Sequence, residues 1–190
     1  MDDIVRQALL KWPNVPACHG WLALDARGDW YMRDDRVQAA GAFPRAKGSR
    51  IEHDKLRQFI ERNYAADEAG AWYFQNGPQR VYVELEAAPW VWRLSPTLQG
   101  TAKVAITSHT GLATTFDAAL TDAAGRLFIA TPLGLRLVHT LDMEAAADAI
   151  ERGAWPLQAV DAATLPARFG FVPSPQAALR AMPSQAPQNT

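Results

Sequence analysis

This chain has one cysteine, no long apolar run and no excess of charge of either sign. The single Cys18 excludes an internal disulfide, and no apolar segment approaches the ~20 residues that cross a bilayer. With 19 basic and 20 acidic residues, the formal net charge is −1, so no bulk field draws the protein to nucleic acid or anionic lipid. The first residues are acidic and do not resemble a secretory leader. We therefore expect a cytoplasmic protein that binds neither nucleic acid nor membrane.

The sequence signatures of common catalytic and cofactor sites are also missing. The chain contains no nucleophile elbow, no P-loop and no dinucleotide-binding fingerprint. Cys18 and His19 are adjacent, and in an extended segment they point to opposite sides, so they form no thiolate–imidazole pair without help. The four histidines lack the close spacing of a preformed metal site: His19, His53, His109 and His139. We predict no metal, no cofactor and no catalytic residue.

Tryptophan is the residue present in excess. Each indole carries a large apolar area and one N–H that needs a partner. Two interpretations stay open, namely filling of a small core and a surface that stacks on a ligand or partner. The seven positions are Trp12, Trp21, Trp30, Trp72, Trp90, Trp92 and Trp155.

A short series of signals occurs twice in the same order. Each series opens with an Asp-x-x-Gly turn, at Asp25–Gly28 and at Asp122–Gly125, which is typical of a hairpin. An apolar strand, a helix and a tryptophan follow in both. Two copies of one supersecondary unit would make two small modules, although such turns are common and the spacing of the two series is unequal.

The local patterns predict an α+β fold made of two small, structurally related hairpin-and-helix modules with mostly antiparallel sheet. We expect helices at 2–12, 54–64 (capped by Asp54) and 142–153, and strands within 20–33, 50–52, 71–74, 80–85, 90–94, 101–107, 117–120, 126–131 and 133–139. Residues 34–49 are expected to form a loop or irregular strand, and 65–70 a connection. The predicted divisions are an N-terminal helix and linker (1–16), a first module (17–97, with its junction at 95–100), a second module (98–172) and a disordered tail (173–190) with a turn of helix at 176–182.

The same residues resemble a bacterial family of unknown function, the domain family numbered 1285. The resemblance lies in the Asp25–Trp30 turn, the Ile51–His53 step, the helix at 54–64, the Pro89-Trp90-Val91 element and the Arg152–Trp155 step. The loop 34–49 and the block 74–80 depart from that pattern and point to a sister family. The resemblance implies a two-repeat α+β fold and carries over no catalytic residue, because the family has no established activity.

The most plausible binding surface in the sequence is a patch of aromatic and arginine side chains. Such patches are typical of stacking ligands and of protein hot spots. The loop Thr107–Gly111, which concentrates hydroxyls around one imidazole, could bind an anion through its backbone; an ordinary turn is the alternative. Trp90 and Trp92 can equally face the core. The candidate ligand-binding residues are Arg80, Tyr82, Trp90, Trp92, Arg93, Ser108 and His109.

These observations favour a non-enzymatic binding or regulatory protein, with a role in signalling, that recognises a small ligand or a protein partner between its two modules. The alternatives are a small hydrolase-like enzyme using His109 or Cys18-His19, and a structural subunit that buries tryptophans in an oligomer.

Overall fold

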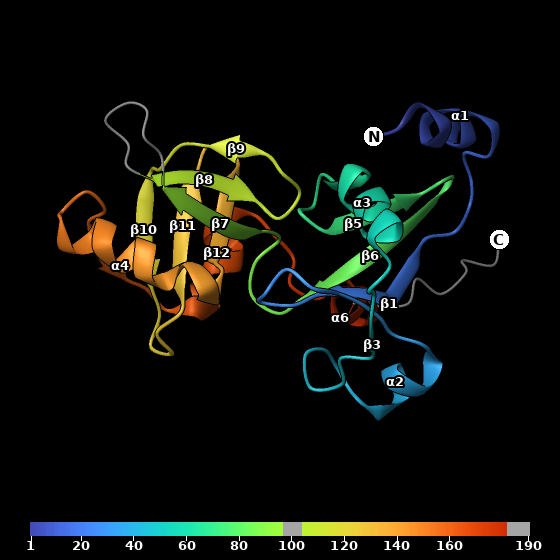
Figure 1. The fold of residues 1–190 in the computed structure, drawn as a ribbon. Coiled ribbons are helices and arrows are strands. Elements are labelled where there is room, and N and C mark those ends of the chain that lie inside the picture. The colour runs from blue at the N-terminus through green and yellow to red at the C-terminus, as the bar shows by residue number, and fades with distance from the viewer. Residues whose placement is uncertain (97–103, 182–190) are drawn as a thin grey trace.

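The computed structural model describes residues 1–96 and 104–181, and each half of the chain forms its own β-sheet (Figure 1). The first sheet contains β1 (Cys18–Leu24), β2 (Trp30–Met32), β3 (Ser49–Arg50), β4 (Tyr64–Ala66), β5 (Trp72–Asn76) and β6 (Gln79–Leu85). The second contains β7 (Val91–Pro96), β8 (Val104–Ser108), β9 (Ala113–Thr114), β10 (Ala118–Thr121), β11 (Leu127–Thr131), β12 (Gly134–Val138) and β13 (Leu157–Ala159). The strand orders are β3-β2-β1-β6-β5-β4 and β13-β10-β11-β12-β7-β8-β9.

Most neighbouring strands in both sheets are antiparallel. The parallel pairs are β1 with β6, β10 with β13 and β12 with β7. The predicted α+β class with mostly antiparallel sheet is therefore confirmed.

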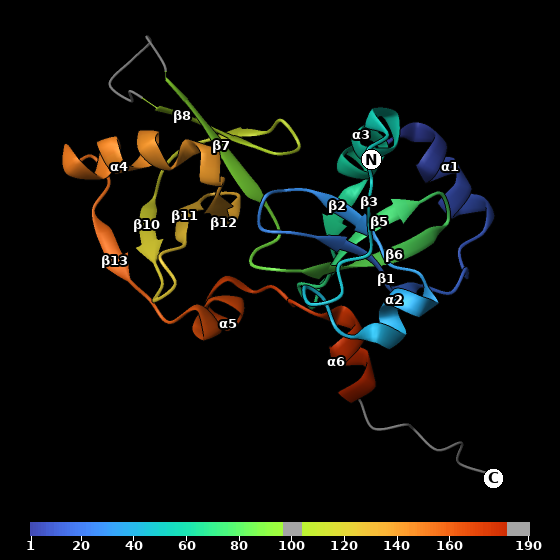
Figure 2. The same ribbon diagram turned by 60° about the horizontal axis from the view of Figure 1, so that its bottom comes forward.

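Helices cover both sheets (Figure 2). They are α1 (Asp3–Lys11), α2 (Asp35–Ala40), α3 (Asp54–Arg62), α4 (Met143–Glu151), α5 (Leu165–Phe169) and α6 (Pro175–Ala181), with two 3₁₀ turns at Thr140–Asp142 and Ala162–Thr164. Helix α3 packs against β5 on one face of the first sheet, and α2 and α6 lie on the other face against β1 and β6. Helix α4 covers one face of the second sheet and α5 the other. Every helix within the described ranges is too short or too polar to cross a bilayer.

One hydrophobic core extends from the first sheet into the second. Leu24 and Trp30 of the first sheet belong to the same buried cluster as Leu120 and Phe128 of the second, and all four are at most 1% exposed. A further cluster lies between α4 and the opposite face of the second sheet. The halves thus share apolar surface that neither could bury alone.

The N-cap of helix α3 lies one residue earlier than predicted. The N-cap is His53, whose Nδ1 accepts the N–H of Leu56 at 3.3 Å, and Asp54 is the first helical residue. The predicted spacing of apolar residues holds, because Ile60 is buried on the sheet. The opposite face carries Asp54, Arg57 and Glu61, which three- and four-residue spacing places on one side of the helix.

Two segments expected to be irregular contain regular structure. Within 34–49 lies α2, which forms because the Asp34 side chain accepts the N–H of Val37 at 2.9 Å. The first two residues of 65–70 are the last two of β4, which pairs with β5. Both segments are held by contacts that are local in the sequence, a side-chain cap for α2 and the β4–β5 hairpin, so the sequence contained signals that the prediction did not use.

The sequence predicted disorder from residue 173 apart from a turn of helix at 176–182; the structure has α6 at 175–181, and residues 173 and 174 are ordered as well. Glu84 is 4% exposed and accepts hydrogen bonds from the Ser174 hydroxyl and, at 3.0 Å, from the Gln176 N–H, which anchors α6 to β6. The Leu85 N–H also donates to the Pro173 carbonyl at 2.8 Å. Residues 173–181 are therefore held by a buried acid of the first half, which the composition of this segment does not reveal.

The chain passes from the first sheet to the second between Leu85 and Val91, because β7 pairs with β8 and β12. This crossing comes earlier than the predicted division at 97/98. The predicted junction at 95–100 and the predicted strand at 101–107 lie partly outside the described residues. The two strand orders differ, so a structural relationship between the modules stays a prediction.

Candidate functional site

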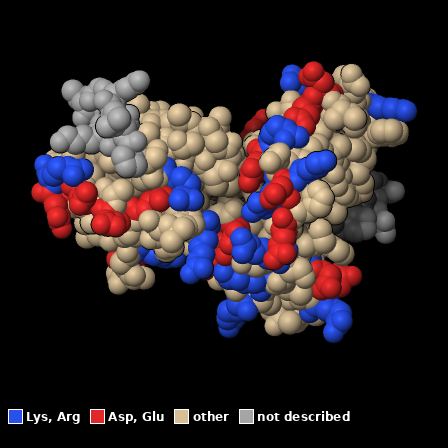
Figure 3. Space-filling model, viewed as in Figure 1, with Lys and Arg blue, Asp and Glu red and all other residues tan. Residues whose placement is uncertain are grey.

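A polar crevice of about 390 Å³ lies where the two halves meet. Figure 3 shows charged side chains of both signs along this boundary and over α3, whereas much of the surface over β8 and β9 is uncharged. We call this hollow the crevice. Its first wall comes from the β1–β2 turn and α3, and its second from β7, the turn after β8 and the end of β12. The lining residues are Arg27, Gly28, Asp29, Asp54, Arg57, Gln58, Glu61, Arg93, His109 and His139.

Two tight turns meet at the crevice. In the first, the Asp25 carboxylate accepts the N–H groups of Arg27 at 2.8 Å and Asp29 at 3.0 Å. In the second, Ser108 Oγ accepts the Leu112 N–H at 3.0 Å. Gly28 has a φ of +82°, and a Cβ there would lie 3.4 Å from the His109 Cβ. A glycine therefore allows both the turn and its close approach to the second half.

The Arg93 side chain is used to connect two elements of the second half. Its Nε and Nη2 donate to the two carboxylate oxygens of Asp142 at 2.7 and 3.3 Å, and Asp142 also accepts the buried Leu94 N–H at 3.0 Å. The hydrogen bond to Asp142 raises the pKa of Arg93. Arg93 therefore borders the crevice as a fixed cation.

The other titratable groups of the crevice respond to burial. Burial raises the pKa of Glu61, an effect that the Trp30 indole N–H partly offsets. Burial, followed by the charge of Arg93, lowers the pKa of His139, whose Nδ1 accepts the Leu141 N–H at 3.0 Å. That bond leaves the proton of the neutral ring on Nε2. At neutral pH the crevice thus presents a neutral imidazole donor beside charges of both signs.

His109 lines the crevice and also contacts buried aromatic rings. Its Nδ1 accepts the Val91 N–H at 3.2 Å, and its ring is 5.7 to 6.3 Å from the rings of Trp30, Tyr64 and Trp90. Burial, and then the charge of Arg136, lower its pKa to about 3. His109 is therefore neutral across the physiological range.

Of the seven residues predicted to bind a ligand, the structure brings only Arg93 and His109 into the crevice. Ser108 is buried and holds the adjoining turn. Trp90 and Trp92 are core residues, 8% and 0% exposed, which decides between the two interpretations of these side chains.

Arg80 and Tyr82 lie on the first sheet, away from the crevice. The Arg80 guanidinium stacks on the Tyr73 ring, and the Tyr82 hydroxyl donates to Asp67 at 2.9 Å. Their strand was expected to continue the surface of Trp90 and Trp92, but β6 and β7 belong to different sheets.

The Cys18-His19 pair does not form a couple. The His19 ring stacks on Tyr82, with centroids 4.5 Å apart, while Cys18 lines an apolar hollow with Trp21 and Phe74. Across residues 1–96 and 104–181, no three His, Cys, Asp or Glu side chains are grouped to hold a metal ion.

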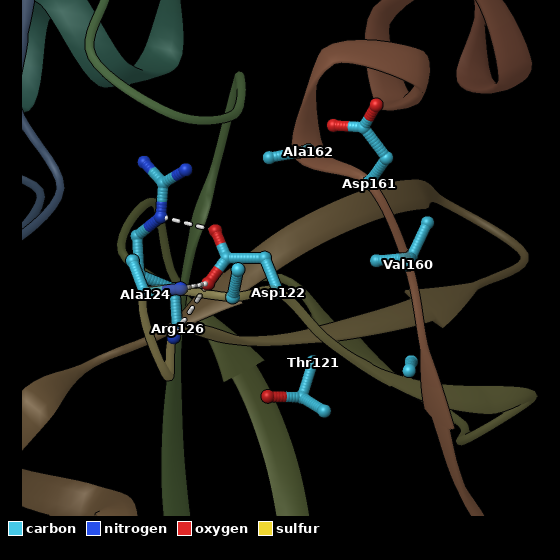
Figure 4. Close-up of a pocket in the computed structure, with 9 residues that line it drawn as sticks. Thr121, Asp122, Ala124, Arg126, Val160, Asp161 and Ala162 are labelled. Carbon is cyan, nitrogen blue, oxygen red and sulfur yellow. Dashed lines mark hydrogen bonds and ion pairs between the residues drawn. The ribbon is translucent and has the colours of Figure 1, made fainter.

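A larger hollow, of about 660 Å³, lies beside the Asp122 turn and residues 159–162 (Figure 4). Its charged groups are engaged locally: Arg126 Nε donates to Asp122 at 2.6 Å, and Asp161 accepts the Ala163 N–H at 2.9 Å. The remaining lining is mostly alanine and valine. This hollow has fewer polar groups available to a ligand than the crevice.

Comparison with known proteins identifies the family. The family model described as "Protein of unknown function (DUF2946)" matches residues 1–176. The chain belongs to this family. No curated protein matches this DUF2946 chain in sequence.

Two solved structures are similar to this DUF2946 protein. A DUF1285 family protein from Silicibacter pomeroyi DSS-3 is 15% identical, with a TM-score of 0.50 over 78% of this chain and 84% of that one. A DUF1285 family protein from Shewanella baltica OS155 is 10% identical, with a TM-score of 0.44 over 67% and 91%. The first likeness shows a shared fold, so the predicted resemblance to family 1285 or a sister family is confirmed.

The sequence reasoning missed Arg136 of this DUF2946 protein. Its guanidinium is 0% exposed and lies between two indoles, 4.0 Å from the Trp90 ring centroid and 4.1 Å from that of Trp92. The sequence offered only an arginine inside the apolar strand 133–139 as a signal. Its neighbours Leu135 and Leu137 point to the opposite face of the sheet, so only the tertiary structure shows that the face of Arg136 is covered.

Proposed function

We propose that this protein is a non-enzymatic binding protein of a regulatory kind that takes a small polar ligand in the crevice between its halves. The composition of the crevice carries the proposal: charged and imidazole side chains from both halves converge on one hollow of about 390 Å³. Ligand sites are concave, are built by several elements and orient their ligands with a few convergent polar groups.

Several side chains of the crevice are not used to hold the fold. Arg27 and Gln58 make no side-chain hydrogen bond or ion pair with other residues of the described ranges, and Glu61 makes no ion pair there. Arg57 and Arg93, in contrast, are paired with Asp54 and Asp142. Polar groups that the fold does not use are those a ligand can engage without breaking internal bonds.

The geometry favours binding over the hydrolase alternative. With a pKa of about 3, His109 is a weak base at neutral pH, and its Nδ1 is already occupied by the Val91 N–H. We also propose a cytoplasmic location, because a single cysteine needs no oxidising compartment.

A thermal-shift screen of small polar metabolites tests the proposal. A ligand at 100 times its Kd adds about 2.7 kcal/mol to the free energy of unfolding, which raises Tm by several degrees in a chain of this size, at about 2–4 °C per kcal/mol. We expect a selective shift for one chemical class.

Variants then locate the site. Arg27→Ala and Glu61→Gln are expected to reduce the shift, because both side chains line the crevice and neither forms an ion pair with the other described residues. The matched controls are Arg36→Ala in α2 and Glu144→Gln in α4, both exposed and outside the crevice. If the crevice variants respond to the ligand as the controls do, the ligand binds elsewhere and the proposal is wrong.

A further inference from the structure

The buried polar side-chain atoms that lack a partner are concentrated in one place. In the described part of the chain they are Trp30 Nε1, Trp90 Nε1, His109 Nε2, Arg136 Nε and Arg136 Nη1. All belong to contacting residues where the two halves meet: the Trp90 ring is 5.7 Å from His109 and 5.9 Å separates His109 from Trp30. The Arg136 guanidinium stacks on Trp90. Such atoms are rare in folded proteins, so their concentration needs a physical explanation.

Each of these atoms is a hydrogen-bond donor. Indole and guanidinium nitrogens can only donate. For His109 the tautomer follows from its other nitrogen: Nδ1 accepts the Val91 N–H, so the neutral ring carries its proton on Nε2. Trp30 differs from the rest because its indole N–H lies close enough to the Glu61 carboxylate to lower the pKa of Glu61. Trp30 is therefore left out of the group defined next. We call Trp90, His109 and Arg136 the donor cluster.

Arg136 is a buried cation without an acidic partner. It forms no ion pair with any carboxylate of the described residues, and its one hydrogen bond runs from Nη2 to the Leu133 carbonyl at 3.0 Å. The guanidinium carbon lies 4.0 and 4.1 Å from the Trp90 and Trp92 ring centroids, and Nε and Nη1 are the donors left without an acceptor. Burial lowers its pKa to about 9, and a buried charge left unpaired is costly.

We propose that the donor cluster receives an oxyanion, a carboxylate or phosphate group, which reaches it from the crevice. His109 provides the connection, because it lines the crevice and also contacts Trp90. An oxyanion accepts several hydrogen bonds at once and bonds most strongly to a guanidinium. This inference rests on the proposed function and specifies the ligand: a polar molecule that carries at least one such group.

The wild-type protein can be tested with inorganic phosphate and with acetate, each against chloride at constant ionic strength. The readout is the set of indole N–H signals in a ¹H–¹⁵N spectrum, with Trp90 assigned from Trp90→Phe. We expect one of the two anions to shift the Trp90 signal saturably, while exposed Trp12 stays in place. A response to phosphate alone assigns a tetrahedral anion, and a response to acetate alone assigns a carboxylate. If neither anion shifts Trp90 before it shifts Trp12, the inference is overturned.

Arg136→Met supplies the second measurement, with Arg80→Met as the matched control. Both arginines stack on aromatic rings, but Arg80 is exposed on the first sheet. We expect anion affinity to fall at least tenfold in Arg136→Met and to be unchanged in Arg80→Met. Equal affinity in both would contradict the inference, and if Arg136→Met does not fold, the wild-type spectrum decides alone.

The two proposals fail in different ways. A neutral or cationic ligand that loses affinity in Arg27→Ala but not in Arg136→Met would support the crevice and overturn the oxyanion. An anion that shifts Trp90 and is indifferent to both Arg27→Ala and Glu61→Gln would support the donor cluster and overturn the crevice as the binding site.

Discussion

At the scale of single residues, one hydrogen-bonding pattern builds four turns in the described part of the chain. The first residue of each turn accepts, through its side chain, the N–H four positions later, and its own N–H donates to that same residue's carbonyl. A glycine with positive φ stands at the fourth position of each turn. Three turns use aspartate and one uses serine: Asp25, Asp67, Asp122 and Ser108.

The Asp122 turn provides a pH-dependent test. Burial opposes ionisation of Asp122, but hydrogen bonds from the Arg126 N–H and side chain outweigh it and lower its pKa below 3.8. A folded-state pKa below the unfolded value stabilises the fold at higher pH, and this stability is lost as pH falls through the folded pKa. We expect the free energy of unfolding to fall less between about pH 5 and about pH 2 in Asp122→Asn than in the wild type, as measured by urea denaturation.

Asp122→Ala completes this series at neutral pH. It removes the acceptor for two backbone N–H groups, those of Ala124 and Arg126, and should cost about 1–3 kcal/mol. Asp122→Asn keeps an acceptor at Oδ1 and should cost less. Equal losses in the two variants would show that the charge, and not the turn geometry, matters.

At the scale of elements, Asp142 joins β7 to the start of α4. It accepts two bonds from Arg93 and one from the buried Leu94 N–H. Asp142 is 8% exposed as a side chain, whereas that of Arg93 is 53% exposed. The carboxylate is therefore structural, and the arginine is its largely solvated partner.

We predict unequal effects when either partner is truncated. Arg93→Ala should cost ~1 kcal/mol or less, since solvent screens the pair. Asp142→Ala also leaves the Leu94 N–H without an acceptor in a buried position and should cost about 2–3 kcal/mol. Chemical denaturation of both variants measures the difference, and a cost for Arg93→Ala equal to that for Asp142→Ala would contradict it.

Whether an element could be predicted depended on how far apart in the sequence its stabilising contacts lie. Helix α3 and the Asp25 and Asp122 hairpins were predictable, because capping, apolar spacing and turn chemistry lie within a few residues. The ordering of residues 173–181 against the first sheet was not, because it depends on hydrogen bonds to a buried Glu84 some ninety positions earlier in the chain.

At the scale of the whole molecule, the two halves should unfold together. Their shared core contains Trp30 and Leu24 from one sheet and Phe128 and Leu120 from the other, and Val172 returns from the second half to bridge Ala71 in the first. Separating the halves would expose that core to water. We expect urea transitions followed by tryptophan fluorescence and by far-UV circular dichroism to coincide.

A matched pair of variants sharpens this expectation. Trp30→Phe perturbs the shared core, and Trp155→Phe perturbs the cluster under α4. Both should shift a single transition to lower denaturant concentration. Two separated transitions, one moved by each variant, would show that the halves unfold independently.

The sequence by itself determined the α+β class, the main turns and helix α3, the family resemblance, and two members of the crevice, Arg93 and His109. These depend on local hydrogen bonds and on spacing along the chain. Only the tertiary structure decided that Trp90 and Trp92 are buried, that Arg80 and Tyr82 lie on another sheet, and that Arg136 sits unpaired between two indoles. The physical reason is that burial and charge pairing depend on which distant strands become neighbours, and strand pairing is not written in the periodicity of any one segment.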